Sequence, residues 1–277
     1  MVSSDTPRLQ GRVVLITRGG HLLDRAALLV EPQCMNWLGW AVFGIVAWIA
    51  LLTLVYLVFL PRLARGPAGD PIVGLAWRLL KVAVRLIHRL KVTGLEHLPD
   101  PDQYGPLVVV CNHTGSIDPL LVSSQCPFMI RWMMGDDLMW DRMKPIWKRM
   151  QLIPVDRKGE RLDALREALR TLRDGGAVGI FPEGRITLPR GEIRPFFDGV
   201  GALIARGKAD TLLVWIEGTP ETNHVLPSLL GLSHAKVHFI DRIPYDGERD
   251  PRVIADRLRQ RIIEASGWKA NEETLPL

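Results

Sequence analysis

Two kinds of hydrophobic pattern alternate along the chain from residue 92 onward. Short runs of consecutive apolar residues are typical of buried strands, whereas apolar residues three or four apart are typical of helices. The short runs predict strands over 107–111, 128–133, 152–155, 177–181, 212–216 and 236–240. The spaced pattern predicts helices over 119–125, 137–149, 160–173, 198–207 and 250–265.

This alternation of strands and helices predicts the fold class. Strands that are apolar along their whole length are buried on both faces, and consecutive strands joined by helices run parallel. Residues 92–277 are therefore expected to form one α/β domain with a largely parallel sheet flanked by helices.

A different pattern occupies residues 37–60, which contain no charged residue. As a helix this segment would be about 36 Å long at ~1.5 Å per residue, enough to cross a hydrocarbon core of ~30 Å. We therefore expect a membrane helix over 37–61, ended by Pro61 and Arg62. The sequence leaves open two alternatives, a helix buried in a soluble core and a helix inserted only halfway into the bilayer.

Residues 62–91 combine a short linker with a second helical pattern over 72–91. Basic residues recur there at spacings of three and four, so they share one face of a helix, while leucine and valine fill much of the rest. This pattern is typical of an amphipathic basic helix lying on an anionic lipid surface, and a helix packed on its own domain is the alternative. The basic residues are Arg78, Lys81, Arg85 and Arg89.

The distribution of charge indicates the partner and the orientation. The net charge is +5, and basic residues are concentrated directly after the apolar segment. That position favours membrane lipids over nucleic acid as the partner. The positive-inside rule then places residues 62–277 on the cytoplasmic side of a bacterial inner membrane.

The cysteines and the N-terminus add little to this picture. The three cysteines fit no zinc-binding spacing and are expected to be reduced thiols of a protein that faces the cytosol. Residues 1–36 form an N-terminal extension of unknown role. Because Met35 stands directly before the apolar run, translation could begin at Met1 or at Met35.

A candidate catalytic pair follows the strand predicted over 107–111. His113 lies just past this strand, at the edge where open α/β sheets bind ligands, and Asp118 follows five residues later. A turn through Gly115 would fold the carboxylate onto the imidazole. An aspartate bonded to Nδ1–H leaves Nε2 able to take a proton from a hydroxyl. Because Asp118 precedes Pro119, a helix N-cap is the structural alternative, and both roles can coexist.

Four motifs of this domain, in the same order, resemble those of the glycerophospholipid acyltransferases of the 1-acyl-sn-glycerol-3-phosphate acyltransferase type. The resemblance covers roughly residues 90–245. The motifs are Asn112 and His113 with Asp118 (N-H-x4-D), LIPVDR ending at Arg157, FPEG at 181–184 and LLVWIEG at 212–218.

The resemblance implies transfer of a fatty acyl group from an acyl thioester to the free hydroxyl of a lysophospholipid. The donor would be acyl-CoA or acyl-ACP, the acceptor 1-acylglycerol-3-phosphate, and the product phosphatidate. It implies His113 as the general base, oriented by Asp118, with no metal and no cofactor. The residues that would hold the phosphate and glycerol of the acceptor are Arg157, Glu183, Gly184 and Arg185.

The third motif departs from the family's commonest form, FPEGTRS, because this chain reads FPEGRITLP. Arg185 comes one position early, and Ile186 occupies the usual arginine place. In an extended stretch, a shift of one residue turns a side chain to the opposite face. Another acceptor, such as lysophosphatidylethanolamine or a lyso-aminolipid, therefore remains an alternative. The alternative of another class is a non-catalytic lipid-binding membrane protein.

Overall fold

In the computed structural model, the chain divides into two compact units, residues 1–51 and residues 52–277. The second unit contains the whole sheet. The residues that the structure describes are 37–64, 66–67, 69–156, 162–187, 190–220, 222 and 225–273.

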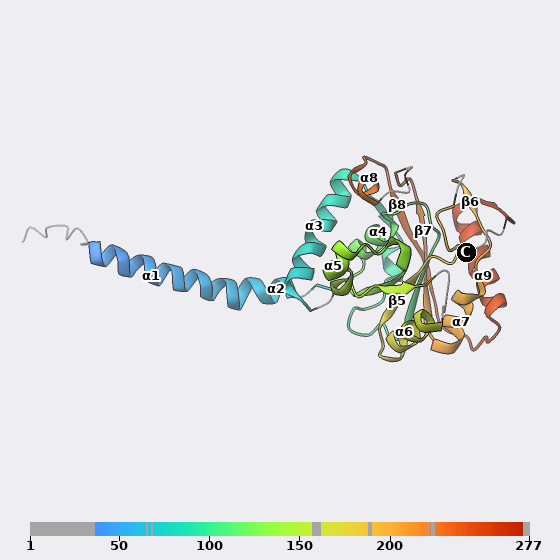
Figure 1. The fold of residues 1–277 in the computed structure, drawn as a ribbon, viewed down its shortest axis with the longest axis horizontal. Helices are drawn as coiled ribbons and strands as arrows, with labels where there is room; N and C mark the ends of the chain where they lie inside the picture. Colours follow the sequence, from blue (N-terminus) through green and yellow to red (C-terminus); the bar gives the residue numbers. More distant parts are fainter. Residues whose placement is uncertain are drawn as a thin grey trace, which may run out of the picture. The chain divides into compact units, whose positions relative to one another are not determined.

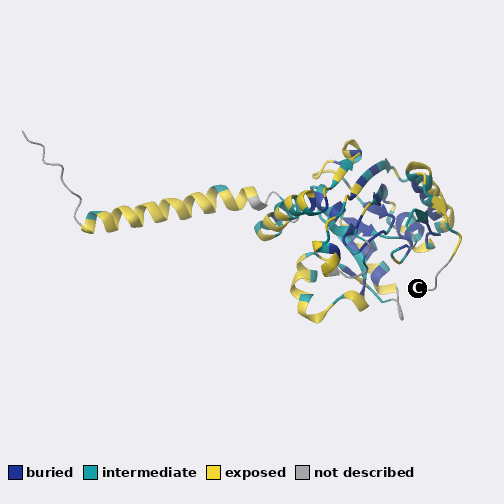
Figure 2. Cartoon of the chain, turned by 90° about the horizontal axis from the view of Figure 1, so that it is seen from above, coloured by how far each residue is buried: buried dark blue, intermediate teal, exposed yellow. Residues whose placement is uncertain are grey.

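The apolar segment is a helix, α1 (Trp37–Leu54), whose side chains are exposed (Figures 1 and 2). The helical run over Trp37–Arg62 has a mean hydropathy of 2.6 and is long and apolar enough to cross a membrane. The expectation that Pro61 ends the helix is wrong. A π-helical turn over Val55–Phe59 precedes α2 (Leu60–Ala64), and the helix continues through the proline. Within an α-helix, a proline leaves the carbonyl four residues earlier without its N–H donor, and its ring clashes with that carbonyl. The π-helical turn before Pro61 changes the hydrogen-bond pattern there, so the helix can continue.

The helix predicted over 72–91 is α3 (Pro71–Ile87), and it is shorter than expected. The Asp70 side chain accepts the N–H groups of Ile72 and Val73, which is a helix N-cap. The indole N–H of Trp77 donates to the carbonyl of Ser123 at 2.9 Å, and this bond ties α3 to the domain. One stripe of α3 nevertheless stays exposed. Its apolar members are Ile72, Leu75, Leu79, Val82 and Leu86.

A seven-stranded sheet forms the centre of the domain, in the order β1-β8-β7-β2-β5-β3-β4. Every pairing in it is parallel except β7 with β8, which is antiparallel, so the largely parallel α/β fold is confirmed. Across the sheet, the strands are β1 (Lys91–Thr93), β8 (Lys236–Ile243), β7 (Asp210–Glu217), β2 (Leu107–Cys111), β5 (Ala177–Ile180), β3 (Ile130–Gly135) and β4 (Ile153–Val155). A separate pair consists of β6 (Glu192–Ile193) and β9 (Lys269–Ala270).

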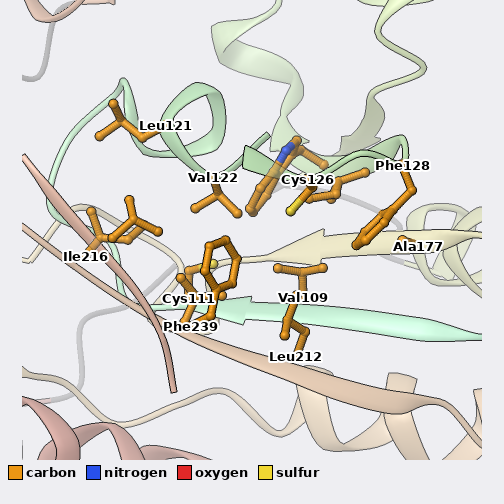
Figure 3. Packing of buried hydrophobic residues seen from close by; sticks show 14 of the residues in the cluster. Val109, Cys111, Leu121, Val122, Cys126, Phe128, Ala177, Leu212, Ile216 and Phe239 are labelled. Carbon is orange, nitrogen blue, oxygen red and sulfur yellow. The ribbon is translucent and has the colours of Figure 1, made fainter. Parts of the chain in front are cut away.

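Helices cover both faces of the sheet, as Figure 1 shows. Alternate residues of β2 separate two cores, because Val109 packs with side chains of α3 and α4 on one face, and Val108 packs with α6, α7 and α9 on the other. Figure 3 shows the first core around Val109, Cys111 and Phe239. The covering helices are α4 (Asp118–Gln125), α6 (Leu162–Arg173), α7 (Asp198–Gly207) and α9 (Pro251–Ser266).

The segment predicted as one helix over 137–149 is corrected by the structure. It contains two 3₁₀ turns, Asp136–Leu138 and Asp141–Met143, and only then α5 (Lys144–Arg149). Pro145 lies in the first turn of α5, where its missing N–H is tolerated, so the α-helix begins there. A short helix that the sequence pattern missed is α8 (Val225–Leu230).

Candidate active site

The site begins where β2 ends. Asn112, the next residue, is buried, and its side chain pairs with the backbone of Ile216 in β7. The amide nitrogen donates to the Ile216 carbonyl at 2.9 Å, and the amide oxygen accepts the Ile216 N–H at 2.7 Å. The Asn112 side chain thus continues the hydrogen bonding between β2 and β7 beyond the last backbone pair. These two bonds fix the direction in which the chain leaves the sheet.

The predicted pair, His113 and Asp118, comes together in the structure. Nδ1 of His113 lies 3.0 Å from Oδ2 of Asp118. The imidazole is 18% exposed, whereas the carboxylate is fully buried. The turn through Gly115 that would bring the two side chains together is present, because the Asp118 N–H donates to the Gly115 carbonyl at 3.1 Å.

Hydrogen bonds to Asp118 identify the proton-bearing nitrogen of the histidine. Oδ2 of Asp118 also accepts the backbone N–H groups of Thr114 at 2.6 Å and Gly115 at 2.9 Å. An oxygen that already accepts two N–H groups acts as an acceptor toward the imidazole too, so Nδ1 of His113 donates. Asp118 is the first residue of α4 rather than its N-cap, which is Ile117. The Asp118 carboxylate therefore binds the loop before α4 and the His113 ring instead of capping the helix.

Glu183, predicted to hold the acceptor, points into the protein and is only 5% exposed. One oxygen accepts the backbone N–H of His113 at 2.9 Å. The other accepts the Thr187 hydroxyl and the Arg194 N–H. Burial raises the pKa of the Glu183 carboxyl, and these hydrogen bonds oppose that shift. With both oxygens engaged, this geometry does not support a direct contact between Glu183 and an acceptor.

The remaining predicted binding residues are placed only in part. Gly184 has a φ of +73°, which favours glycine, and its N–H closes a turn onto the Phe181 carbonyl at 3.0 Å. Arg185 follows it with an exposed side chain. Arg157 lies outside the described residues, so its predicted role stays a prediction.

Arg190 is a site residue that the sequence pattern missed. Its guanidinium donates to the carbonyls of Thr114, Thr219 and Pro220, the last at 2.6 Å. One cation thus joins the loops that follow β2, β5 and β7. The Thr219 hydroxyl extends this contact to the hydroxyl of Thr114 at 3.1 Å. No motif marks Arg190, since these partners lie 29 to 76 residues away in sequence.

This arrangement can move a proton. With Nδ1 donating to Asp118, Nε2 is the acceptor nitrogen of a partly exposed imidazole, which is the state a general base needs. Within the described residues, no group of three or more His, Cys, Asp or Glu side chains is placed to hold a metal ion. Cys111 and Cys126 are buried free thiols, and burial raises the pKa of both.

Fold and site together define an α/β protein with an aspartate-oriented histidine at the carboxyl edge of a largely parallel sheet. A model of one protein family, described as Acyltransferase, matches residues 89–227, which is half of the chain. The chain therefore belongs to the acyltransferase family.

Two curated relatives are similar to this chain. The 1-acyl-sn-glycerol-3-phosphate acyltransferase of Bacillus subtilis is 29% identical over 132 residues, which cover 47% of this chain and 63% of the relative. The protein of the same name from Borreliella burgdorferi is 26% identical over 187 residues, covering 63% of this chain and 72% of the relative. The match to the Bacillus subtilis protein thus spans less than two thirds of that protein's length.

A solved structure shares the fold. The 1-acyl-sn-glycerophosphate (LPA) acyltransferase PlsC of Thermotoga maritima matches with a TM-score of 0.55 and 18% sequence identity. The match covers 72% of this chain and 82% of that one. At this identity the similarity supports the predicted fold and is silent on the substrate.

Proposed function

We propose that this protein transfers a fatty acyl group from an acyl thioester to the free hydroxyl of 1-acylglycerol-3-phosphate, giving phosphatidate. The observation that carries the proposal is the contact of 3.0 Å between Nδ1 of His113 and the buried carboxylate of Asp118. Two curated relatives that bear the name of this activity support the choice of acceptor.

The reaction follows from the orientation of the imidazole. Nε2 of His113 takes the proton of the acceptor hydroxyl as the oxygen forms a bond to the thioester carbonyl carbon. Asp118 stabilises the imidazolium that forms. The tetrahedral intermediate then breaks its carbon–sulfur bond, and the imidazolium returns the proton to the departing thiolate. The donor is acyl-CoA or acyl-ACP, and the protein's residues alone account for the proton transfers.

The phosphate of the acceptor needs fixed cations. Arginine suits this role because its planar guanidinium donates to two phosphate oxygens at once. Arg185 is exposed beside the FPEG turn, and Arg157 is the second candidate from the sequence. Arg190 is engaged with three backbone carbonyls and is assigned to holding the loops instead.

A second acceptor class is favoured by one observation. Ile186 stands where the family's commonest motif has arginine, and Arg185 comes one position early, so the position that the motif gives to a cation is apolar in this chain. A phosphodiester carries one negative charge at neutral pH, fewer than a phosphomonoester. Lysophosphatidylethanolamine is therefore the second candidate.

We further propose that the protein is attached to the bacterial inner membrane with its catalytic domain on the cytoplasmic side. The basic residues that follow the apolar segment favour the cytoplasmic side. Three features support the attachment to a membrane. The helical run over Trp37–Arg62 is long enough to span the bilayer. The stripe on α3 exposes five apolar side chains next to basic residues. Near the end of α3, the Ser233 N–H donates to the Ile87 carbonyl. This bond places beside α3 the loop that follows α8, and α8 with this loop exposes Leu226, Leu230 and Leu232.

An acceptor panel tests the proposed activity. Purified full-length protein in lipid nanodiscs is given one labelled thioester at a time, acyl-CoA or acyl-ACP, with either lysophosphatidate or lysophosphatidylethanolamine. We expect labelled phosphatidate from the first acceptor. Labelled phosphatidylethanolamine alone would favour the second candidate. Absence of transfer with every pair would favour a non-catalytic lipid-binding protein.

A matched pair of histidine variants controls this assay. His113→Ala removes the proposed base. His97→Ala removes a histidine that also lies near a carboxylate, with Nδ1 3.7 Å from Asp241, but outside the motifs. Loss of transfer in the first variant and retention in the second is the expected result.

A further inference from the structure

Three aromatic rings form a continuous stack that ends at His113. The imidazole lies against the Phe181 ring with centroids 4.1 Å apart and planes 20° from parallel. The Phe181 ring also lies against the indole of Trp132, with centroids 4.9 Å apart and planes 14° from parallel. The three side chains come from the loop after β2, the residue after β5, and β3.

The far end of the stack is rigid. Trp132 is 2% exposed, and its indole N–H donates to the Ser123 hydroxyl at 2.8 Å. Its neighbour on β5 is Gly179, in register with it. A Cβ at Gly179 would lie 2.4 Å from the indole ring. Only glycine therefore lets the indole lie flat over β5 and support Phe181.

Helix α4 carries both residues that hold the ends of this stack, Asp118 and Ser123. Ser123 belongs to α4, whose first residue is Asp118. Asp118 holds one edge of the imidazole through Nδ1. A single hydrogen bond holds one edge of the ring, and coupled changes of χ1 and χ2 can still tilt the plane of the ring while that contact is kept. The flat contact with Phe181 supplies that second constraint.

The stack also affects the charge on the histidine. A general base becomes cationic when it takes the proton of the acceptor hydroxyl. The face of an aromatic ring carries partial negative charge and attracts a cation placed over it. Phe181 therefore faces the charged ring while Asp118 bonds its edge.

We infer that Phe181, supported by Trp132, is a positioning residue for His113 that fixes the plane of the imidazole and stabilises its cationic form during acyl transfer. This inference rests on the proposed function, in which His113 is the general base. It goes beyond that function by assigning a role to two rings of the core.

The test uses full-length protein in nanodiscs and two leucine variants. Phe181→Leu keeps an apolar side chain but removes the aromatic face. Phe128→Leu is the control, because Phe128 belongs to the core against which Phe181 packs and stacks on Tyr104, at 4.6 Å and 29°, rather than on His113. Trp132→Phe is the conservative variant, since it keeps a flat ring beneath Phe181 although it is smaller and lacks the hydrogen bond to Ser123.

We expect kcat to fall about tenfold in Phe181→Leu, equivalent to ~1.4 kcal/mol of transition-state stabilisation, with little change in KM. Without the aromatic face, the ring holds its proton less strongly. The acidic limb of the kcat/KM profile should therefore move to lower pH, by about half a unit. Phe128→Leu should leave the profile unchanged, and Trp132→Phe should lie close to the parent protein.

A measurement independent of activity reads the stack itself. With 13C at Cε1 of histidine, the ring current of Phe181 should shift the His113 resonance upfield, and His113→Gln assigns that signal. In Phe181→Leu the resonance should return downfield. An active parent protein whose Phe181→Leu variant keeps its resonance, kcat and pH profile overturns the positioning role alone. A parent protein that transfers no acyl group contradicts the proposed function instead.

Discussion

Glu183 accepts the backbone N–H of His113 at 2.9 Å, although 70 residues separate them in the sequence. The contact is reciprocal between their loops, because the Thr187 N–H donates to the His113 carbonyl at 2.9 Å. The loop after β5 thus holds the backbone of the proposed base from both sides. The FPEG motif therefore has a structural role, which is to hold the backbone of His113 in place.

Glu183→Gln should therefore destabilise the protein and slow it. A carboxamide donates at one of its two polar atoms, whereas both oxygens of Glu183 accept hydrogen bonds. One unsatisfied buried group costs about 1–3 kcal/mol, so a melting temperature lowered by about 2–12 °C is expected. Thermal unfolding and kcat are the measurements, with Glu167→Gln, a partly exposed partner of Arg131, as the control. Equal behaviour of the two variants would contradict the role of Glu183.

Asn112→Ala should damage the β2–β7 junction. The change leaves the buried N–H and carbonyl of Ile216 without their side-chain partners. At about 1–3 kcal/mol for each unsatisfied group, the expected loss of stability is about 2–6 kcal/mol. Denaturant unfolding measures it. A loss below ~1 kcal/mol would mean that water or a neighbouring strand replaces the amide.

Arg190→Ala should loosen three loops at once, because Arg190 lies in the loop after β5 and its guanidinium donates to carbonyls of the loops after β2 and β7. We expect a lower kcat and a lower melting temperature. Arg190→Lys should rescue little, since an ammonium lacks the planar fork of donors. Arg170→Ala, an exposed change on α6, is the control. If Arg190→Ala instead raises KM for the acceptor alone, Arg190 binds substrate.

His88 should make stability depend on pH. Burial lowers the pKa of its ring, whose nitrogens face the Ser233 hydroxyl and the Leu229 carbonyl. The unfolded chain takes up this proton near pH 6.5. The stability contribution is therefore present above about pH 6.5 and is lost as pH falls through that value toward the lower folded pKa. His88→Gln should show a smaller fall in melting temperature between pH 7.5 and 5.5. An equal fall in both proteins would contradict this.

Much of the fold is predictable from sequence because its core strands are short apolar runs between helices. β2 is found with its bounds over 107–111, and α7 over 198–207. The three-residue β1 is missed because it contains one apolar residue, Val92, and the six-residue α8 is missed because it spans less than two helical turns. The prediction of one helix over 137–149 is wrong because a helical spacing of apolar residues does not distinguish 3₁₀ turns from an α-helix.

Some residues of the site could be predicted from the sequence, and others could not. His113 and Asp118 are five residues apart, and the strand before them together with the N-H-x4-D motif predicts that they pair. The inward orientation of Glu183 and the carbonyl contacts of Arg190 join segments far apart in sequence, and spacing carries no information about them. The stack of Phe181 on His113 is hidden for the same reason.

The central claim is that His113, oriented by Asp118, removes the proton of the acceptor hydroxyl. Its most direct test is the kcat of acyl transfer to lysophosphatidate by Asp118→Asn in full-length protein whose melting temperature is checked. An amide at this position no longer selects the Nδ1–H tautomer, so kcat should fall about 10²–10⁴-fold with KM nearly unchanged. Transfer at the parent rate by a folded Asp118→Asn protein would contradict the claim.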